Sequence, residues 1–329
     1  MNNRSGKLGI TLFMITLIAA CTPGAATTEP IAITIQLGTT HQAVYAGFYA
    51  ADQNGYYTDE GLKVNFLSGG TDIDIGARVL DGTAQFAVIG ASTLIVDRAN
   101  ARPLRAVATI LRRDPVAFFS LAESGIIRLQ DFVGKRIQVN ARLRPRLLAM
   151  LAHAGIDENE ITLVSTGTYT DLYSGAIDVA SGLVTSSALA AKRAGHTLNI
   201  VYPDDYGVHF YSTVIFSTDD FIANNPDLVL RVLRASFQGW EFAVENPQAT
   251  GAMVTKYNPA ADADFEAASV AAMLPYINTG EDHIGWMKPE IWAGMLLTMQ
   301  QQKEVTTALD PTKLYTMDFI QQIYGENNP

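Results

Sequence analysis

The chain has 329 residues, of which 48% are hydrophobic and 17% charged, which excludes a disordered or fibrous protein and predicts about two globular domains. Its formal net charge of −10 argues against sequence-independent binding to nucleic acid. The single cysteine excludes a disulfide framework, a cysteine-based zinc site and an iron–sulfur cluster.

The N-terminus has the pattern of a secretory signal. Arg4 and Lys7 precede an apolar run over residues 8–18, which is too short to span a bilayer. The run leads into Ile-Ala-Ala-Cys, ending at Cys21, which resembles a bacterial lipobox. We therefore predict a lipoprotein signal peptide over 1–20 and lipidation of Cys21. The alternative is an ordinary signal peptide in which the cysteine is incidental.

The segment 21–30 is rich in threonine, alanine, proline and glycine and is predicted to be a tether. Removal of residues 1–20 leaves 21 basic and 33 acidic residues, a net charge of −12. No later run reaches 18 apolar residues. The sequence thus predicts a soluble body that a lipid anchor holds on the extracytoplasmic face of the cell membrane. A protein at this location has no access to cytoplasmic ATP.

Beyond the tether, short apolar runs alternate with helical patterns. Strands are predicted at 31–37, 62–67, 85–89, 104–111, 116–121, 136–139, 161–164, 177–180, 198–202 and within a long β-rich stretch at 208–216. Helices are predicted at 42–54, 72–81, 92–100, 145–154, 186–194, 227–245, 248–257, 262–274, 289–303 and 317–324.

This order predicts an α/β protein with two lobes and a helical C-terminal tail. We place lobe I at 31–113 plus 215–329 and lobe II at 114–214, so that the chain crosses between the lobes twice. Such a double crossing makes a hinge, and the cleft between the lobes can close on a ligand.

Three segments resemble solute-binding proteins related to the binders of thiamine pyrimidine precursors and of sulfonates. The first, at 45–64, reads YAGFYAADQNGYYTDEGLKV. The second, at 81–88, reads DGTAQFAV, and the third, at 129–137, reads LQDFVGKRI. The resemblance extends from about residue 31 to about residue 260.

The resemblance implies a periplasmic-binding-protein fold and a monomer that delivers its ligand to the permease and ATPase of an ABC importer, without a cofactor. Eukaryotic relatives are enzymes that use pyridoxal phosphate, iron and a cysteine-rich motif. That chemistry has no support here, because Cys21 is the only cysteine. An exported cofactor-dependent enzyme is the alternative of another class.

The ligand is less clearly indicated. Thiamine-precursor binders carry a tryptophan and a Pro-Asn pair in the first strand and loop, whereas residues 35–43 read IQLGTTHQA. The pattern resembles more closely a branch that includes riboflavin-binding lipoproteins. We therefore expect riboflavin or a similar flat aromatic vitamin, with a thiamine pyrimidine precursor or a sulfonate as the alternative.

Ligand contacts in α/β lobes come from loops at the carboxyl ends of strands. In lobe I these positions are Thr39, Thr40, Tyr45, Gly70, Thr71 and Ser92. The turn at 68–71 is expected to open a helix, so its backbone amides could hold an anion or a carbonyl group. Each position also has a structural explanation: a threonine or serine can cap a helix, and two glycines can form a plain turn. Phe48 and Tyr49 are expected in the core.

In lobe II and the second crossing, the corresponding positions are Asn140, Tyr169, Thr185 and His209. Arg142, Arg144 and Arg146 at a helix start either contact a phosphate or polyol or are merely solvated. Trp240, Trp286 and Trp292 are expected to pack. The five histidines lack metal-ligand spacing, and no G-x-S-x-G, H-E-x-x-H or Walker-type motif occurs, so no catalytic or metal site is predicted.

Overall fold

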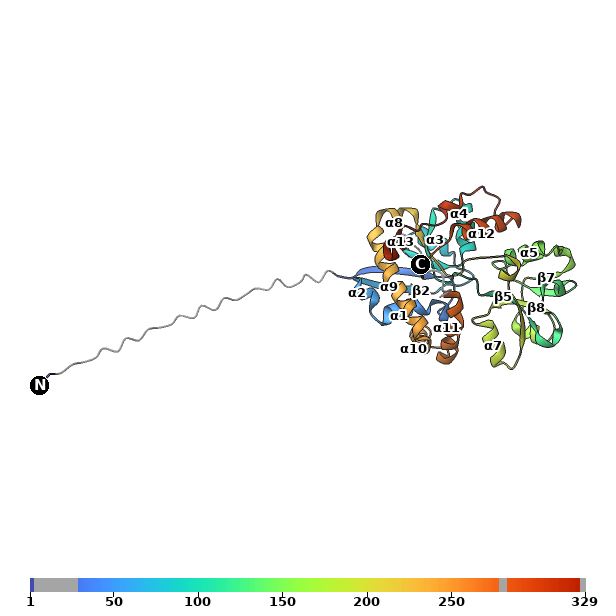
Figure 1. Cartoon of the computed structure of the whole chain (residues 1–329), viewed down its shortest axis with the longest axis horizontal. Coiled ribbons are helices and arrows are strands. Elements are labelled where there is room, and N and C mark those ends of the chain that lie inside the picture. The colour runs from blue at the N-terminus through green and yellow to red at the C-terminus, as the bar shows by residue number, and fades with distance from the viewer. Residues whose placement is uncertain (3–28, 278–282, 326–329) are drawn as a thin grey trace.

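The computed structural model describes residues 1–2, 29–277 and 283–325 (Figure 1). The predicted signal peptide and Cys21 lie outside the described residues, as does most of the predicted tether. No helix in the described part of the chain is long and apolar enough to cross a membrane.

In the described residues, ten strands form two five-stranded sheets. The first sheet has the order β2-β1-β3-β10-β4, with strands at Leu62–Leu67, Ile31–Leu37, Phe86–Ile89, Val214–Thr218 and Leu104–Thr109. The second has the order β7-β6-β8-β5-β9, with strands at Thr162–Val164, Arg136–Gln138, Val179–Leu183, Val116–Leu121 and Leu198–Val201. We call the first sheet with its helices lobe I and the second lobe II.

Thirteen α-helices pack around these sheets in the described residues. Lobe I has α1 Ala46–Gln53, α2 Tyr56–Asp59, α3 Ile75–Leu80, α4 Ala91–Ala99, α8 Asp219–Asn224, α9 Pro226–Glu245, α10 Pro247–Val254, α11 Ala263–Ile277, α12 Pro289–Gln301 and α13 Asp318–Tyr324. Lobe II has α5 Arg144–His153, α6 Tyr169–Tyr173 and α7 Ser187–Arg193. Figure 1 shows α9–α13, the predicted helical tail, on the lobe I side of the molecule together with α8, which the sequence analysis did not predict.

Each sheet contains one antiparallel strand, and it is the strand that enters from the other lobe. β10 runs antiparallel to β3 and β4, and β5 runs antiparallel to β8 and β9. The other four strands of each sheet therefore end at the edge that faces the crossings. Loops at these carboxyl ends meet between the lobes, where open α/β sheets bind ligands.

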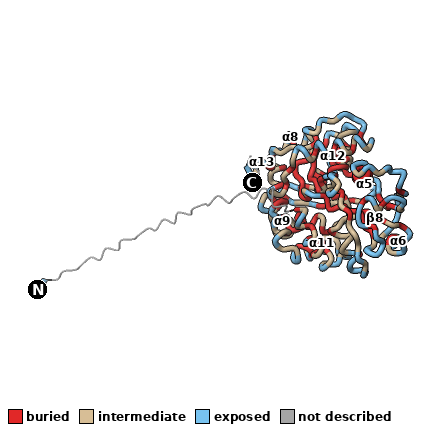
Figure 2. Tube along the Cα trace, turned by 45° about the vertical axis from the view of Figure 1, so that its right-hand side comes forward, coloured by how far each residue is buried: buried red, intermediate tan, exposed pale blue. Residues whose placement is uncertain are grey.

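Buried apolar residues form one cluster within lobe I, a second that continues from lobe I into lobe II, and a small third around Leu172 in lobe II. Figure 2 shows the buried segments running through the interior of the molecule. Trp240 and Trp292 are fully buried, and Trp286 packs partly buried against the lobe I core, as the sequence predicts. Phe48 and Tyr49 are fully buried too, which confirms them as core residues.

Two segments differ in extent from the sequence prediction. Within the β-rich stretch 208–216, strand β10 begins only at Val214 and continues to Thr218, because residues 208–213 form the second crossing between the lobes. The helix predicted from residue 72 begins at Ile75, because the Asp74 carboxylate caps it by accepting the Ala77 N–H at 2.9 Å.

Asp74 also pairs with Arg102 at 2.6 Å, and these contacts lower its pKa to about 2. A carboxyl group with a depressed pKa stabilises the fold above its unfolded value near 4, and this contribution is lost as the pH falls through 2. We expect Asp74→Asn to cost less than about 1 kcal/mol at pH 7, because the side chain is half exposed. Urea unfolding at pH 7 and at pH 2 measures this, and an equal effect at both values would contradict it.

Candidate ligand site between the lobes

A cavity of about 240 Å³ lies between the two lobes. Lobe I contributes the start of α4 and the end of α12, and lobe II contributes the loop after β6. Its lining includes Ser92, Thr93, Ala141, Arg142 and Met299. The cavity is slightly smaller than the 300–1,000 Å³ that is usual for ligand pockets, so a vitamin-sized molecule needs more room than it offers in this arrangement of the lobes.

Ser92 presents an available hydroxyl to this cavity. It follows β3 through Gly90, the residue before α4, and only 9% of its surface is exposed. Among the described residues no partner hydrogen-bonds its hydroxyl, and the helix has no side-chain cap. A buried polar group of this kind can form a hydrogen bond with a ligand at little desolvation cost.

Arg142 faces Ser92 from lobe II and provides positive charge. No carboxylate in the described ranges forms an ion pair with it, whereas the cavity's acids are paired: Asp97 with Arg102 at 2.9 Å and Glu304 with Arg144 at 3.5 Å. Burial raises the pKa of Tyr45, and the charge of Arg142 acts to lower it. The guanidinium is therefore close enough to lobe I to act across the cleft.

The loop after β1 is ordered by its own contacts. The Thr39 N–H donates to the Tyr45 hydroxyl at 3.0 Å, and the Gln42 side chain donates to the Thr39 hydroxyl at 2.7 Å. Tyr45 is 4% exposed and lies in the lobe I core, whereas Thr40 is exposed. Thr40 does not cap the following 3-10 helix, where Gln42 occupies the cap position. Thr39 and Thr40 are not among the residues that line the cavity between the lobes, and Tyr45 supports the loop.

Gly70 and Thr71 follow β2 but do not open a helix, because α3 begins four residues after Thr71. The neighbouring Gly69 packs tightly, since a Cβ there would lie 2.1 Å from the Leu37 carbonyl oxygen. Gly70 has open space around it, and Thr71 is exposed. The backbone anion site expected from a helix start at this turn is therefore absent.

The lobe II candidates are spread over several loops. Asn140 is exposed and accepts the Leu143 N–H at 3.1 Å, so it orders the turn before α5. Thr185, after β8, is buried. Tyr169 donates its hydroxyl to the Ser181 carbonyl at 3.3 Å, and burial raises the pKa of Tyr169 to about 12. His209 is exposed and pairs with Asp204 at 2.6 Å.

The three arginines at the start of α5 have different environments. Arg142 lines the cavity, and Arg144 bridges to Glu158 and across the lobes to Glu304. Arg146 is 3% exposed and ion-paired with Asp114, so neither a ligand contact nor solvation describes it. The sequence analysis did not predict this ion pair. The one sequence feature that could have indicated it is the helical spacing, which turns Arg146 inward while Arg144 faces outward.

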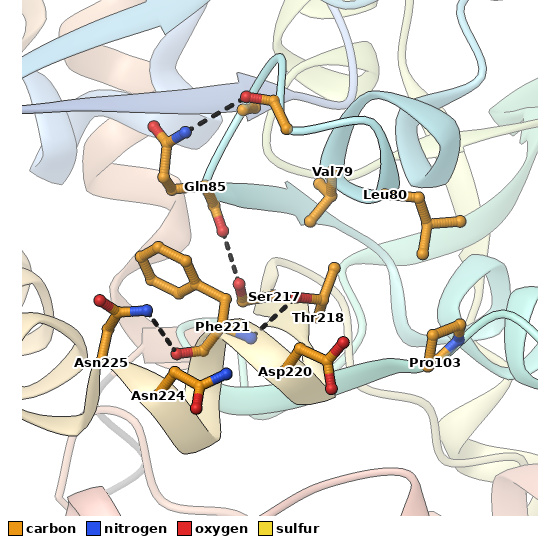
Figure 3. A pocket seen from close by; sticks show the side chains of 12 residues that line it. Val79, Leu80, Gln85, Pro103, Ser217, Thr218, Asp220, Phe221, Asn224 and Asn225 are labelled. Carbon is orange, nitrogen blue, oxygen red and sulfur yellow. Dashed lines mark hydrogen bonds between the residues drawn. The ribbon is translucent and has the colours of Figure 1, made fainter.

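A larger cavity, of about 420 Å³, lies at the opposite end of the lobe I sheet (Figure 3). Several of its polar groups already bond to one another. The Ser217 hydroxyl donates to the Gln85 carbonyl at 2.6 Å, and the Thr218 hydroxyl accepts the Phe221 N–H at 3.0 Å. Because it lies at the amino ends of β3 and β4, away from the crossings, we favour the cavity between the lobes as the ligand site.

A family model described as "NMT1/THI5 like" matches residues 42–250. The chain belongs to this family. In the described ranges, no group of three histidine, cysteine, aspartate or glutamate side chains is arranged to hold a metal ion.

Three relatives have assigned names. The riboflavin-binding protein RibY of Chloroflexus aurantiacus is 24% identical over 95% of this chain and 97% of its own length. The formylaminopyrimidine-binding protein of Halalkalibacterium halodurans is 26% identical over 88% of this chain and 91% of its own. A 4-amino-5-hydroxymethyl-2-methylpyrimidine phosphate synthase of Legionella pneumophila is 26% identical over 69% of this chain and 74% of its own. Binding proteins and enzymes thus both occur among the relatives.

Solved structures confirm the fold. The sulfonate ABC transporter binding protein SsuA of Methylobacillus flagellatus superposes with a TM-score of 0.69, covering 91% of this chain and 97% of its own, at 16% identity. The predicted periplasmic-binding-protein fold is therefore correct. The domain boundaries and ligand contacts drawn from the sequence stay predictions.

Proposed function

We propose that this protein is the solute-binding component of an ABC importer that takes up riboflavin or a similar flat aromatic vitamin. The similarity to RibY carries this proposal, because it spans almost the full length of both chains. The fold and the cavity between its lobes support it, since such a cavity suits a ligand held from both sides.

The proposed mechanism is binding and closure without a covalent step, so the protein acts as a binder rather than an enzyme. A ligand that touches Ser92 and Arg142 bridges the lobes and favours the closed state. Two ion pairs in the described residues also join the lobes: Arg144–Glu304 at 3.5 Å and Arg193–Asp262 at 3.0 Å. Both pairs are largely solvent-exposed and therefore weak, so neither holds the lobes firmly together.

In this proposal Cys21 carries a lipid that anchors the protein to the extracytoplasmic face of the membrane, and a permease with its ATPase receives the ligand. Mass spectrometry of the protein from membranes tests the anchor. A lipid-modified Cys21 at the mature N-terminus is expected, and an unmodified cysteine would contradict it.

Riboflavin binding is tested with purified protein stripped of ligand by unfolding and refolding. We expect saturable quenching of flavin fluorescence at micromolar or lower concentrations, with no competition from 4-amino-5-hydroxymethyl-2-methylpyrimidine. An absence of quenching, together with a rise in unfolding temperature on adding the pyrimidine, would contradict riboflavin as the ligand and favour a thiamine pyrimidine precursor.

An anionic ligand, such as a sulfonate or a phosphorylated vitamin, is the second candidate, and the unpaired Arg142 favours it. We expect Arg142→Gln to weaken flavin mononucleotide binding about ten-fold more than riboflavin binding, the scale of one lost charge-assisted hydrogen bond, because only the phosphate needs the positive charge. Fluorescence titrations of both ligands measure this. Arg128→Gln, at an exposed arginine of lobe II, is the control. Equal losses of affinity for both ligands would contradict a contact between Arg142 and an anionic group of the ligand.

A further inference from the structure

The first crossing changes its attachment from lobe I to lobe II at one residue. Leu111 still pairs with the second crossing at the edge of the lobe I sheet, accepting the Ser212 N–H at 3.3 Å. Arg112 donates its N–H to the Tyr276 carbonyl of α11 at 2.9 Å and its side chain to the Ile277 carbonyl. Asp114, two residues on, is held by Arg146 of lobe II. Between them lies Arg113, which is exposed.

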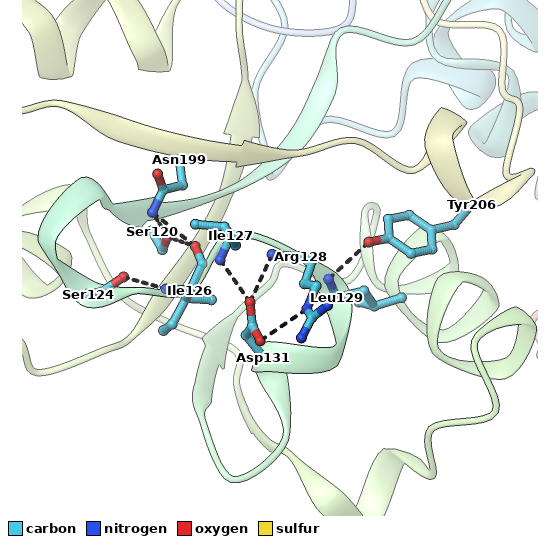
Figure 4. Close-up of polar contacts among 9 residues, drawn as sticks. All are labelled: Ser120, Ser124, Ile126, Ile127, Arg128, Leu129, Asp131, Asn199 and Tyr206. Atoms are coloured by element: carbon cyan, nitrogen blue, oxygen red, sulfur yellow. Dashed lines mark hydrogen bonds and ion pairs between the residues drawn. The ribbon is translucent and has the colours of Figure 1, made fainter.

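The second crossing changes its attachment equally abruptly. On the lobe II side, the Tyr206 hydroxyl accepts the Leu129 N–H at 3.0 Å (Figure 4), and His153 of α5 contacts the Tyr206 carbonyl at 2.7 Å. The Arg146 guanidinium lies over the Phe210 ring, with its Cζ atom 4.3 Å from the ring centroid. The next residue, Tyr211, belongs to lobe I: its carbonyl accepts the Ala91 N–H at 3.2 Å.

Arg146 is a side chain that contacts both crossings at their lobe II ends. It is 3% exposed, ion-paired with Asp114 of the first crossing and stacked on Phe210 of the second. It also donates to the Arg142 carbonyl at 3.2 Å, in the loop that lines the cavity. A planar guanidinium can make these contacts together because its donors lie in a rigid fork.

We propose that Arg146 is a positioning residue that clamps both crossings to lobe II, so that the lobes rotate about Arg113 and the Phe210–Tyr211 peptide. The clamp makes lobe II, the cavity loop at Arg142 and the lobe II ends of both crossings move as one body. Closure then brings Arg142 to Ser92 in one fixed orientation. Only the part of this proposal that concerns affinity rests on the proposed function.

The distribution of distances between the lobes tests the clamp in ligand-free protein. Spin labels are placed at Thr83→Cys in lobe I and Ser174→Cys in lobe II, both exposed, in a Cys21→Ser background that has no other cysteine. Arg146→Gln alone leaves Asp114 buried and unpaired, which destabilises the fold. The decisive variant is therefore Asp114→Asn with Arg146→Gln, in which two neutral amides replace the buried charges.

We expect the double variant to unfold within a few degrees of the wild type, while the width of its interlobe distance distribution about doubles. Riboflavin affinity is expected to fall about ten-fold, because apparent affinity is reduced by the fraction of molecules able to close correctly. Asp178→Asn with Arg136→Gln, which neutralises a lobe II ion pair of 2.8 Å away from the crossings, is the matched control and is expected to change neither quantity.

The proposal would be overturned if the double variant had the wild-type distance distribution. It would also be overturned if the double variant bound riboflavin with the wild-type affinity as well as unfolding at the wild-type temperature. If the wild type does not bind riboflavin, the proposed ligand is wrong. The distance comparison between the double variant and its control still decides the role of Arg146 in that case.

Discussion

Replacing Gly47 with alanine is expected to lower the free energy of unfolding by about 3 kcal/mol, the upper end of what overpacking a core usually costs. Gly47 lies in α1 where this helix crosses α9. A Cβ at Gly47 would lie 2.1 Å from Cδ2 of Trp240, which is fully buried and has no space to move into. A Cβ at Gly239, on the facing helix, would lie equally close, 2.1 Å from the Gly47 carbonyl oxygen. Urea unfolding measured by tryptophan fluorescence gives the value.

Gly294→Ala is the matched control for this prediction. Gly294 is an exposed residue inside α12, and a Cβ there would have nothing within 4 Å. Alanine is the better helix former, so this variant is expected to gain about 0.5–1 kcal/mol. The contact between α1 and α9 would be disproved if Gly47→Ala unfolded at the same urea concentration as the wild type.

Ser92→Phe is expected to weaken riboflavin binding at least 100-fold, equivalent to about 2.7 kcal/mol. The phenyl ring would project into a cavity of only about 240 Å³ and occupy the space that the ligand needs. Position 92 lies in the first turn of α4, next to this space, so the lobe I fold is expected to persist. Quenching titrations measure the affinity, and circular dichroism checks the fold.

Thr83→Phe is the control for this blockade. Thr83 is exposed and lies just before β3, whereas Ser92 follows the same strand, so the two variants place the same ring at opposite ends of the lobe I sheet. Wild-type affinity is expected for Thr83→Phe. Should Ser92→Phe keep a dissociation constant within three-fold of the wild type, the ligand does not bind in the cavity between the lobes.

Much of the architecture could be predicted from local patterns. Strands such as β1 and helices such as α9 follow from the alternation of apolar and polar residues, because one face of each element must be buried. The start of α3 and the extent of β10 were missed for a different reason. A capping carboxylate at Asp74 decides the start of α3, and the passage of residues 208–213 between the lobes delays β10 to Val214. Periodicity registers neither a single capping residue nor a crossing between lobes.

The site was less predictable than the fold. Post-strand position correctly brings Ser92 to the cavity between the lobes, because the topology turns carboxyl ends toward the crossings. The same rule selected Tyr45, yet its hydroxyl is taken up by Thr39. The rule places a residue near the cleft but does not reveal the direction of its side chain, which depends on packing against distant segments.

The sequence by itself determined the export signal pattern, the two α/β lobes, the helical tail and the family resemblance. These depend on the order and spacing of neighbouring residues. Tertiary structure alone decided that Arg142 stays unpaired beside the cavity while Arg146, one helical turn later, is buried against Asp114 and Phe210. The partners of Arg146 lie 32 and 64 positions away in the chain, so only the folded arrangement of both crossings brings them to it.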